Sequence, residues 1–297
     1  MQNNTKLDCS PFDDPIVGAC FASAETAGEA MRSFANSITS KDNIEIAEVT
    51  SVVPQSYSKM PGQRGTRVDV KSKTTTNQDI ILEVNLYVDK FIHQRNFLAA
   101  AQIIANSASP NTTPEQMAKS MPYVIAINIL NYAIRDDHDH WLQPARFVYT
   151  KPPHIIALPQ YVSYDIELPK FKNATPDWND DSYCWMYALI KAHEERKTMK
   201  EVSNMITELK PFSTTNDGFK QFSERYEFIA TSDEIRDEYQ KWQRELLRQA
   251  GIMEAARDEG EAKGRAEGMD ALAGELMKLG FDQSDIAAAM EKIIAKQ

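Results

Sequence analysis

The chain has 297 residues with 43 acidic and 33 basic side chains, so its formal net charge is -10. This charge excludes a protein whose whole surface is basic and coats nucleic acid, and 42% hydrophobic residues exclude wholesale disorder. The sequence shows no apolar run of about 18 residues and no secretory signal pattern, so we expect a cytoplasmic protein without membrane contact.

The charge is unevenly distributed along the chain. Residues 221–297 contain 17 acidic and 11 basic side chains, whereas residues 59–100 contain seven basic and four acidic ones, a net charge of +3. A local basic patch around carboxylates suits a metal-dependent phosphodiester site, and it suits an ordinary solvated hairpin equally well. Charge alone therefore leaves both interpretations open.

The first half of the chain alternates between helical and strand patterns. Residues 13–38 begin with Asp-Asp-Pro and continue with apolar residues at helical spacing, which predicts one or two helices. Three β-rich segments are predicted as strands, the last two joined by a hairpin at TTTNQ: residues 44–53, 67–70 and 79–88. Two further segments are predicted as helices: residues 91–106 and 113–119.

Tyr123–Leu130 is a continuous apolar run, the pattern of a strand buried on both faces. Two more strands are predicted, at residues 146–150 and 161–168, and beyond Pro169 the patterns are mostly helical. The predicted helices cover residues 181–197, 198–208, 216–229 and 233 to about 248. This order predicts an α/β protein with a central sheet flanked by helices and a helical C-terminal annex.

The C-terminal tail has its own composition. Gly260, Gly264 and Gly268 recur every four residues, which places them nearly along one helix face where another backbone could approach. A small helical hairpin is expected after this stretch, with Gly280 ending its first helix. We therefore divide the chain into a core (1–175), a helical extension (176–249), and a glycine-repeat connector with its hairpin module (250–297).

The segments RVDV and LEVN contain the residues with the clearest chemical meaning. If they are adjacent antiparallel strands, Asp69 and Glu83 can point from the same face and share a divalent cation, and Asn85 projects from that face as well. Mg²⁺ keeps several waters, so these carboxylates with a backbone carbonyl such as that of Val84 suffice. Two strand carboxylates can equally be exposed residues of a sheet face.

An ordered set of motifs over roughly residues 12–295 gives the sequence a family resemblance. The set comprises Asp14-Pro15 with Phe21, Arg67-Val68-Asp69-Val70, Glu83 with Asn85, Arg95, the strand from Pro122 to Leu130, IELPKF (Ile166 to Phe171), and the glycine-repeat tail. The sequence resembles the bacterial PD-(D/E)xK nuclease family transposases, also called recombination-promoting nucleases. The resemblance implies a restriction-endonuclease-like core with a mixed central sheet.

The resemblance also implies roles for individual residues. Asp69 and Glu83, with Val84, would hold Mg²⁺ (or Mn²⁺), and Asp14 would be a further acidic residue acting through water. Asn85 would stand where the superfamily has lysine and this family usually glutamine. The expected DNA contacts are Arg67, Lys71, Lys73 and Arg95.

The leading hypothesis is a divalent-metal-dependent DNA endonuclease of the transposase or recombination-promoting type, acting as a homodimer or higher oligomer. Asn85 is shorter than glutamine and lacks the charge of lysine, and Val17-Gly18 replaces the family's Phe-Lys. The second hypothesis is therefore a catalytically weakened or inactive nuclease fold that binds DNA or regulates a mobile element. A third is a protein-interaction scaffold built on the acidic helices.

Other candidate sites are better explained without a ligand. The segment DDHDHW (Asp136 to Trp141) alternates histidine and carboxylate but is expected to be a solvated loop. His93 and His154 are isolated in the sequence, and the aromatic cluster WNDDSYCWMY has the helical spacing of packed residues. Neither a catalytic serine motif nor a phosphate-binding glycine loop is present.

Overall fold

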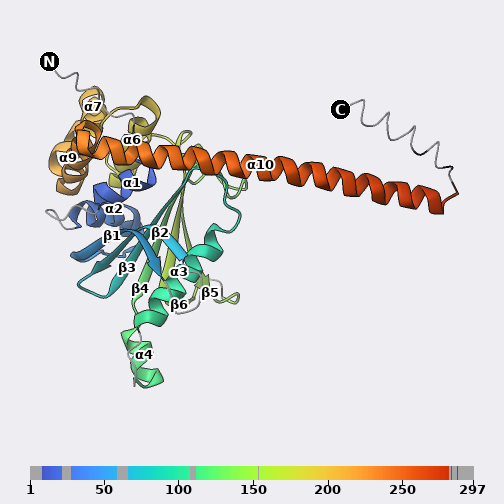
Figure 1. Ribbon diagram of the computed structural model, residues 1–297. Coiled ribbons are helices and arrows are strands. Elements are labelled where there is room, and N and C mark those ends of the chain that lie inside the picture. The colour runs from blue at the N-terminus through green and yellow to red at the C-terminus, as the bar shows by residue number, and fades with distance from the viewer. Residues whose placement is uncertain are drawn as a thin grey trace, which may run out of the picture. The chain divides into compact units, whose positions relative to one another are not determined.

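The computed structural model describes residues 9–21, 28–58, 66–107, 112–152, 154–280, 282 and 286. The chain divides into two compact units, Met1–Asp233 and Glu234–Gln297, and each is described by itself. The first unit contains the sheet and most of the helices, and the second contains the long helix α10 (Figure 1).

The first unit is built on a six-stranded mixed sheet with the order β1-β2-β3-β4-β6-β5. Its strands are β1 (Val49–Ser58), β2 (Thr66–Thr74), β3 (Gln78–Asn85), β4 (Tyr123–Leu130), β5 (Leu142–Val148) and β6 (Ile156–Glu167). Strands β1, β2 and β3 pair antiparallel, β3, β4 and β6 pair parallel, and β5 returns antiparallel to β6. The sheet flanked by helices that the element order predicts is thus confirmed.

Strand β4 lies inside the sheet and is buried along almost its whole length. Parallel strands covered on both faces need apolar side chains on both, which is why YVIAINIL shows no alternation. The expected hairpin joins β2 to β3, and Asn77 adopts the left-handed conformation in its turn (φ 60°). Both features follow directly from the sequence patterns.

Three strands begin at residues well away from the predicted ones: β1 at Val49 and not at Ile44, β5 at Leu142 and not at Arg146, and β6 at Ile156 and not at Tyr161. The side chain of Asn36 explains part of the difference at β1. Its Oδ1 accepts a hydrogen bond from the Ile46 N–H at 2.7 Å, and its Nδ2 donates to the Ile46 carbonyl at 3.2 Å. Both backbone groups of Ile46 are thereby satisfied without a strand partner.

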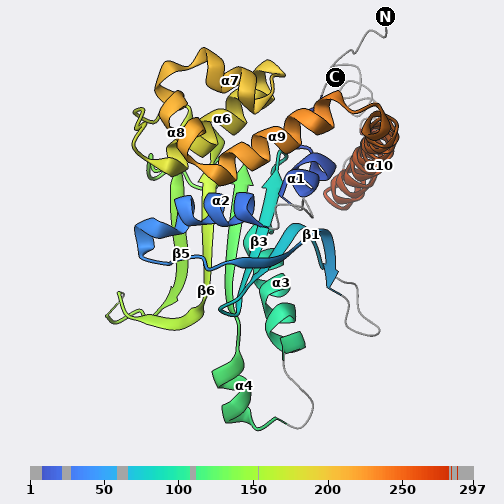
Figure 2. The ribbon, with the colours of Figure 1, turned by 90° about the vertical axis from the view of Figure 1, so that its left-hand side faces the viewer.

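Helices cover both faces of the sheet. The helices of the unit are α1 (Asp14–Phe21), α2 (Glu29–Thr39), α3 (Ile92–Ser107), α4 (Pro114–Ser120), α5 (Leu168–Phe171), α6 (Asp181–Glu195), α7 (Met199–Met205), α8 (Lys210–Thr215) and α9 (Asp217–Thr231), with short 3₁₀ turns at Ser40–Asp42 and Thr207–Leu209. Helix α2 packs against α6 and α9, whereas α3 lies on the opposite side of the sheet from α1 and α2 (Figures 1 and 2).

The helical layer around α2 has an aromatic core centred on Trp185. This residue is fully buried, and its ring contacts those of Phe34 and Phe219 at centroid distances of 5.6 and 5.0 Å. Tyr183 in the same segment is also buried and stacks on Phe171. These contacts support the interpretation of the aromatic segment as packing and not as a base-stacking surface.

In the second unit, α10 extends over Asp233–Lys278, far beyond the predicted end near Arg248. The glycines at 260, 264 and 268 lie inside this helix, although each weakens a helix by about 1 kcal/mol relative to alanine. The alanine, glutamate, lysine and arginine residues around them are strong helix formers, which explains why the helix continues. The proposed boundaries after residues 175 and 249 stay predictions.

The expected terminal hairpin falls mainly outside the described residues. Its first part, Leu272 to Lys278, belongs to the continuous helix α10, and Gly280 follows in the left-handed conformation (φ +90°) expected of a helix-ending glycine. Within the part of the chain that the structure describes, no helix is long and apolar enough to span a membrane.

Candidate active site

Asp69 and Glu83 lie at one end of the β2–β3 hairpin, and both side chains are buried. The two strands pair from Lys73 opposite Asp79 to Val70 opposite Leu82. Beyond this end, the Asp69 carboxylate (Oδ2) accepts a hydrogen bond from the backbone N–H of Val84 at 2.8 Å. A carboxylate thus takes the place of a ladder bond and holds Asp69 against the strand of Glu83. The two segments are adjacent antiparallel strands, as the sequence predicts.

Asn85 follows two residues after Glu83, at the end of β3, and is half-buried. Its backbone carbonyl accepts a hydrogen bond from the Asn131 N–H at 3.0 Å. Its side-chain Nδ2 is buried and has no hydrogen-bond partner among the described residues. A hydrogen bond to a buried amide donor is worth about 1–3 kcal/mol, so this group is a donor that water or a ligand can satisfy.

Arg95 is the predicted DNA contact that lies beside the carboxylates. Its guanidinium Nη2 is 3.8 Å from Glu83 Oε2, and its Nη1 donates to Asp89 Oδ2 at 2.5 Å. The side chain is about half exposed, so it can reach solvent while it contacts a buried carboxylate. Arg95 therefore links the start of α3 to the end of β3.

The remaining predicted cations are placed differently. Lys71 Nζ lies 3.4 Å from Asp79 Oδ1, toward the hairpin turn, and Lys73 is exposed opposite Asp79. The backbone of Arg67 pairs with Tyr57 in β1, but its side chain lies outside the described part. Asp14 is the first residue of α1, and its side chain lies outside the described part as well.

A polar network continues the line of the carboxylates across the sheet. The strand register sets Glu83 beside Asn128 of β4, and Asn128 beside Asp165 of β6. Asn128 Nδ2 donates to Asp165 Oδ1 at 2.7 Å, and Asn96 of α3 donates to Asn128 Oδ1. His93 Nε2 lies 2.7 Å from Asp165 Oδ2. This hydrogen bond to Asp165 raises the pKa of the His93 imidazole.

Over residues 19–256 the chain matches the family model described as PD-(D/E)XK nuclease family transposase. The chain belongs to this family. No curated protein and no solved structure matches it. The mixed sheet with flanking helices agrees with the restriction-endonuclease-like fold of PD-(D/E)XK nucleases. The family match is narrower than the expected span of 12–295, and it leaves Asp14 and Gly260 to Gly268 outside.

The network of Asn96, Asn128 and Asp165 was not predicted from the sequence of this nuclease-family chain. His93 was described there as isolated. The missed signal was a polar residue inside an apolar strand, since Asn128 interrupts YVIAINIL and Asp165 interrupts the β6 run. Such a residue requires a buried partner. Which partner it finds depends on strand order, and a pattern along one strand does not specify that order.

Within the described residues no group of three or more His, Cys, Asp or Glu side chains is arranged to hold a metal ion. The two predicted metal ligands, Asp69 and Glu83, are fewer than three such side chains. The histidine-rich segment from Asp136 to His140 lies in the loop between β4 and β5 and is mostly exposed. His138 is its half-buried member, and its Nδ1 lies 3.3 Å from Lys170 Nζ.

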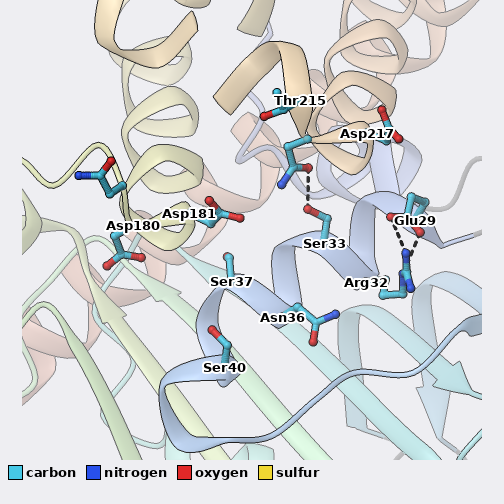
Figure 3. A pocket seen from close by; sticks show the side chains of 12 residues that line it. Glu29, Arg32, Ser33, Asn36, Ser37, Ser40, Asp180, Asp181, Thr215 and Asp217 are labelled. Atoms are coloured by element: carbon cyan, nitrogen blue, oxygen red, sulfur yellow. Dashed lines mark hydrogen bonds and ion pairs between the residues drawn. The ribbon is translucent and has the colours of Figure 1, made fainter. Parts of the chain in front are cut away.

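A separate polar cavity of about 630 Å³ lies between α2 and the N-terminal ends of α6 and α9 (Figure 3). Ser33 Oγ donates to Asn216 Oδ1 at 2.7 Å, and Arg32 pairs with Glu29. Three further acidic residues line the cavity: Asp180, Asp181 and Asp217. The lining contains none of the residues that the sequence predicts for the site, and its charged side chains are four acids and one arginine.

Proposed function

We propose that this PD-(D/E)XK nuclease family transposase is a divalent-metal-dependent DNA endonuclease that hydrolyses phosphodiester bonds. The hydrogen bond from the Val84 N–H to Asp69 supports the proposal most directly, because it holds Asp69 against the strand that carries Glu83. Asn85 and Arg95 then provide donors beside these carboxylates. Oxygen ligands and nearby donors are what hydrolysis of a phosphate ester needs.

The donor set fits Mg²⁺ or Mn²⁺. Mg²⁺ retains several waters and takes one or two protein carboxylates with substrate phosphate, so Asp69, Glu83 and the Val84 carbonyl are sufficient protein ligands. A divalent cation held by these groups would supply Lewis-acid chemistry to the phosphate and would make a nearby water more acidic. The buried partnerless amide of Asn85 is the observation that favours an additional group at this position.

The protein's own side chains perform the remaining tasks. The Asn85 amide donates to a phosphate oxygen or to the attacking water and so fixes its direction of approach. Arg95 neutralises charge next to Glu83 and offers its exposed edge to the phosphate that is being cleaved. Lys71, Lys73 and Arg67 contact neighbouring phosphates along β2.

The same proposal places two chains on one duplex, since each chain contributes one such site and a double-strand break needs two cuts. It also places the protein in the cytoplasm, where reduced thiols are the rule. The three cysteines at positions 9, 20 and 184 are buried and form no disulfide in the described part of the chain, which supports that placement.

A second function, DNA binding without efficient cleavage, is favoured by one observation. Asn85 is a neutral, short side chain at the position where related nucleases use glutamine or lysine, so the charge that develops in the transition state meets one cation fewer. Arg95 supplies positive charge next to Glu83 from a separate element, α3. This candidate keeps the DNA site but predicts a slow or undetectable turnover.

Incubation of the purified chain with supercoiled plasmid and Mg²⁺ tests the first function. The wild type is expected to nick the plasmid, whereas Asp69→Asn and Glu83→Gln, which keep shape and remove charge, are expected to lose activity by at least about a hundredfold. Asp136→Asn, an exposed loop acid, is the matched control and should cleave normally. Plasmid binding without nicking would favour the second function, and nicking that persists in both site variants would contradict the assignment.

A further inference from the structure

A small pocket opens on the β5–β6 side of α3, next to His93. Its volume is about 180 Å³, and its lining includes Phe97 from α3, Phe147 from β5, and Tyr161 and Ser163 from β6. Drug-sized ligands occupy pockets of roughly 300–1,000 Å³, so this pocket has room for a single planar ring system. Its position and lining are separate from the carboxylates of the proposed active site.

Three aromatic rings meet at this pocket. The centroid distances are 5.4 Å between Phe97 and Phe147, 5.9 Å between Phe97 and Tyr161, and 6.0 Å between Phe147 and Tyr161. Phe97 and Phe147 remain 45% and 44% exposed, so the cluster is open to solvent and not a closed core. Exposed aromatic rings held by their neighbours are the surface on which nucleic-acid bases stack.

His93 gives the pocket a fixed polar edge. It lies four residues before Phe97, on the same face of α3, and its Nε2 is held 2.7 Å from Asp165 Oδ2. With Nε2 engaged, Nδ1 is the nitrogen that remains for a ligand. Asp165 is itself anchored by Asn128, so the ring orientation is determined by buried residues and not by solvent.

The same network relates the pocket to the proposed active site. Glu83 pairs with Asn128 and Asn128 pairs with Asp165, so Asp165 lies two strands away from Glu83 in line across the sheet. At the usual strand spacing of about 4.8 Å, the two residues are about 10 Å apart. A separation of this size is spanned within a few nucleotides of one DNA strand. Helix α3 contributes to both places, through Arg95 toward Glu83 and through His93 toward the pocket.

We propose that this pocket binds an unpaired base of the DNA strand whose phosphate is held at Asp69 and Glu83. The inference rests on the proposed function, because the active site defines where the strand runs. The base contacts Phe97, Phe147 and Tyr161, and the held imidazole of His93 forms a hydrogen bond with its edge. A base inside a duplex is stacked and paired, so the pocket selects single-stranded or locally opened DNA.

Fluorescence anisotropy with the full-length chain in EDTA tests the pocket without any cleavage. The probes are a labelled single-stranded oligonucleotide, an entirely abasic strand of equal length and charge, and a duplex of the same sequence. Phe97→Ala and Phe147→Ala are expected to weaken binding of the single strand about tenfold each, as removal of a stacking ring does. Neither is expected to alter binding of the abasic strand or the duplex, and Phe147→Trp should retain wild-type affinity.

Phe228→Ala on α9 removes an equally exposed ring in the other helical layer and should change nothing. The inference is overturned if the wild type does not bind the single strand, or if the Phe97 and Phe147 variants bind it as the wild type does. It is also overturned if Phe147→Ala changes only the oligomeric mass in light scattering. Plasmid cleavage by the wild type and these variants is measured in a separate assay. If the wild type does not cleave plasmid, the result contradicts the proposed function and not the pocket.

Discussion

At position 85 the chain places an asparagine whose buried Nδ2 has no hydrogen-bond partner, two residues beyond Glu83. An amide can direct a water or a phosphate oxygen, but it does not neutralise charge. The side chain is also too short to reach as far as glutamine. Residue 85 is therefore where the chemistry of this site is most open to change by one substitution.

Asn85→Lys is expected to increase the rate of plasmid nicking by about tenfold, because an added cation stabilises charge that develops in the transition state. Asn85→Ala is expected to lower the rate, since it removes the donor and adds nothing. Single-turnover rates under saturating Mg²⁺ measure both effects. A rate for Asn85→Lys at or below that of the wild type would show that residue 85 does not limit the reaction.

At the scale of secondary structure, a row of polar residues crosses strands β3, β4 and β6: Glu83, Asn128 and Asp165. Asn128 is the central member, because it accepts from Asn96 and donates to Asp165 while wholly buried. Asn128→Leu keeps the branched shape of the side chain but leaves two buried polar groups unpaired, which is expected to lower the free energy of unfolding by about 2 kcal/mol. Urea denaturation measures the loss. Asn131→Ala, an exposed residue just after β4, is the control, and an equal loss in both would contradict the argument.

The contact between α3 and β6 depends on pH through His93. Its hydrogen bond with Asp165 raises the pKa of the folded imidazole above the ordinary value of 6.5. The protonated form is thus favoured by folding, so the stabilisation is complete below the pKa of the unfolded chain and is lost as pH rises through the folded pKa. Because His93 is about half exposed, solvent screening keeps the effect small.

The corresponding measurement is the urea midpoint of the wild type and of His93→Gln across about pH 5.5 to about pH 8.5. The wild type is expected to be the more stable of the two at the acidic end, and the difference should shrink toward the basic end. A difference that is constant with pH, or that grows as pH rises, would show that the imidazolium does not stabilise the α3–β6 contact.

Most elements could be predicted from the sequence, because each depends on a local pattern. The apolar run of β4 and the capping box of α4 at Thr113 and Gln116 are examples. The pairing of Asp69 with the strand of Glu83 was also accessible, since a short turn joins the two strands. The contact of His93 with Asp165 was not, because it joins residues 72 positions apart through a parallel strand order that no local pattern encodes.

At the scale of the whole molecule, the unexpected feature is the length of α10. The sequence favoured a helix followed by a connector, but the helix continues through its glycines to Lys278. A Cβ added at Gly260, Gly264 or Gly268 would meet no atom within 4 Å among the described residues. A face of small residues without a neighbour among the described residues leaves room for a second helix to approach closely.

We therefore expect a dimer in solution whose interface includes residues 250–297. Deletion of these residues should convert the dimer to a monomer, as measured by light scattering. Replacement of the three glycines by leucine keeps the helix but fills the face, and should weaken the dimer as well. If the truncated chain has the mass of a dimer, the interface lies elsewhere in the molecule.

The central claim is that Asp69 and Glu83 together hold a divalent cation. Calorimetric titration of the full-length chain with Mn²⁺ in the absence of DNA tests this claim most directly, because it requires no turnover and no knowledge of the preferred DNA sequence. The account predicts a binding step in the wild type and in Asp136→Asn that is absent from the Asp69→Asn, Glu83→Gln double variant. Wild-type heats that persist unchanged in the folded double variant, or no binding by the wild type, would contradict it.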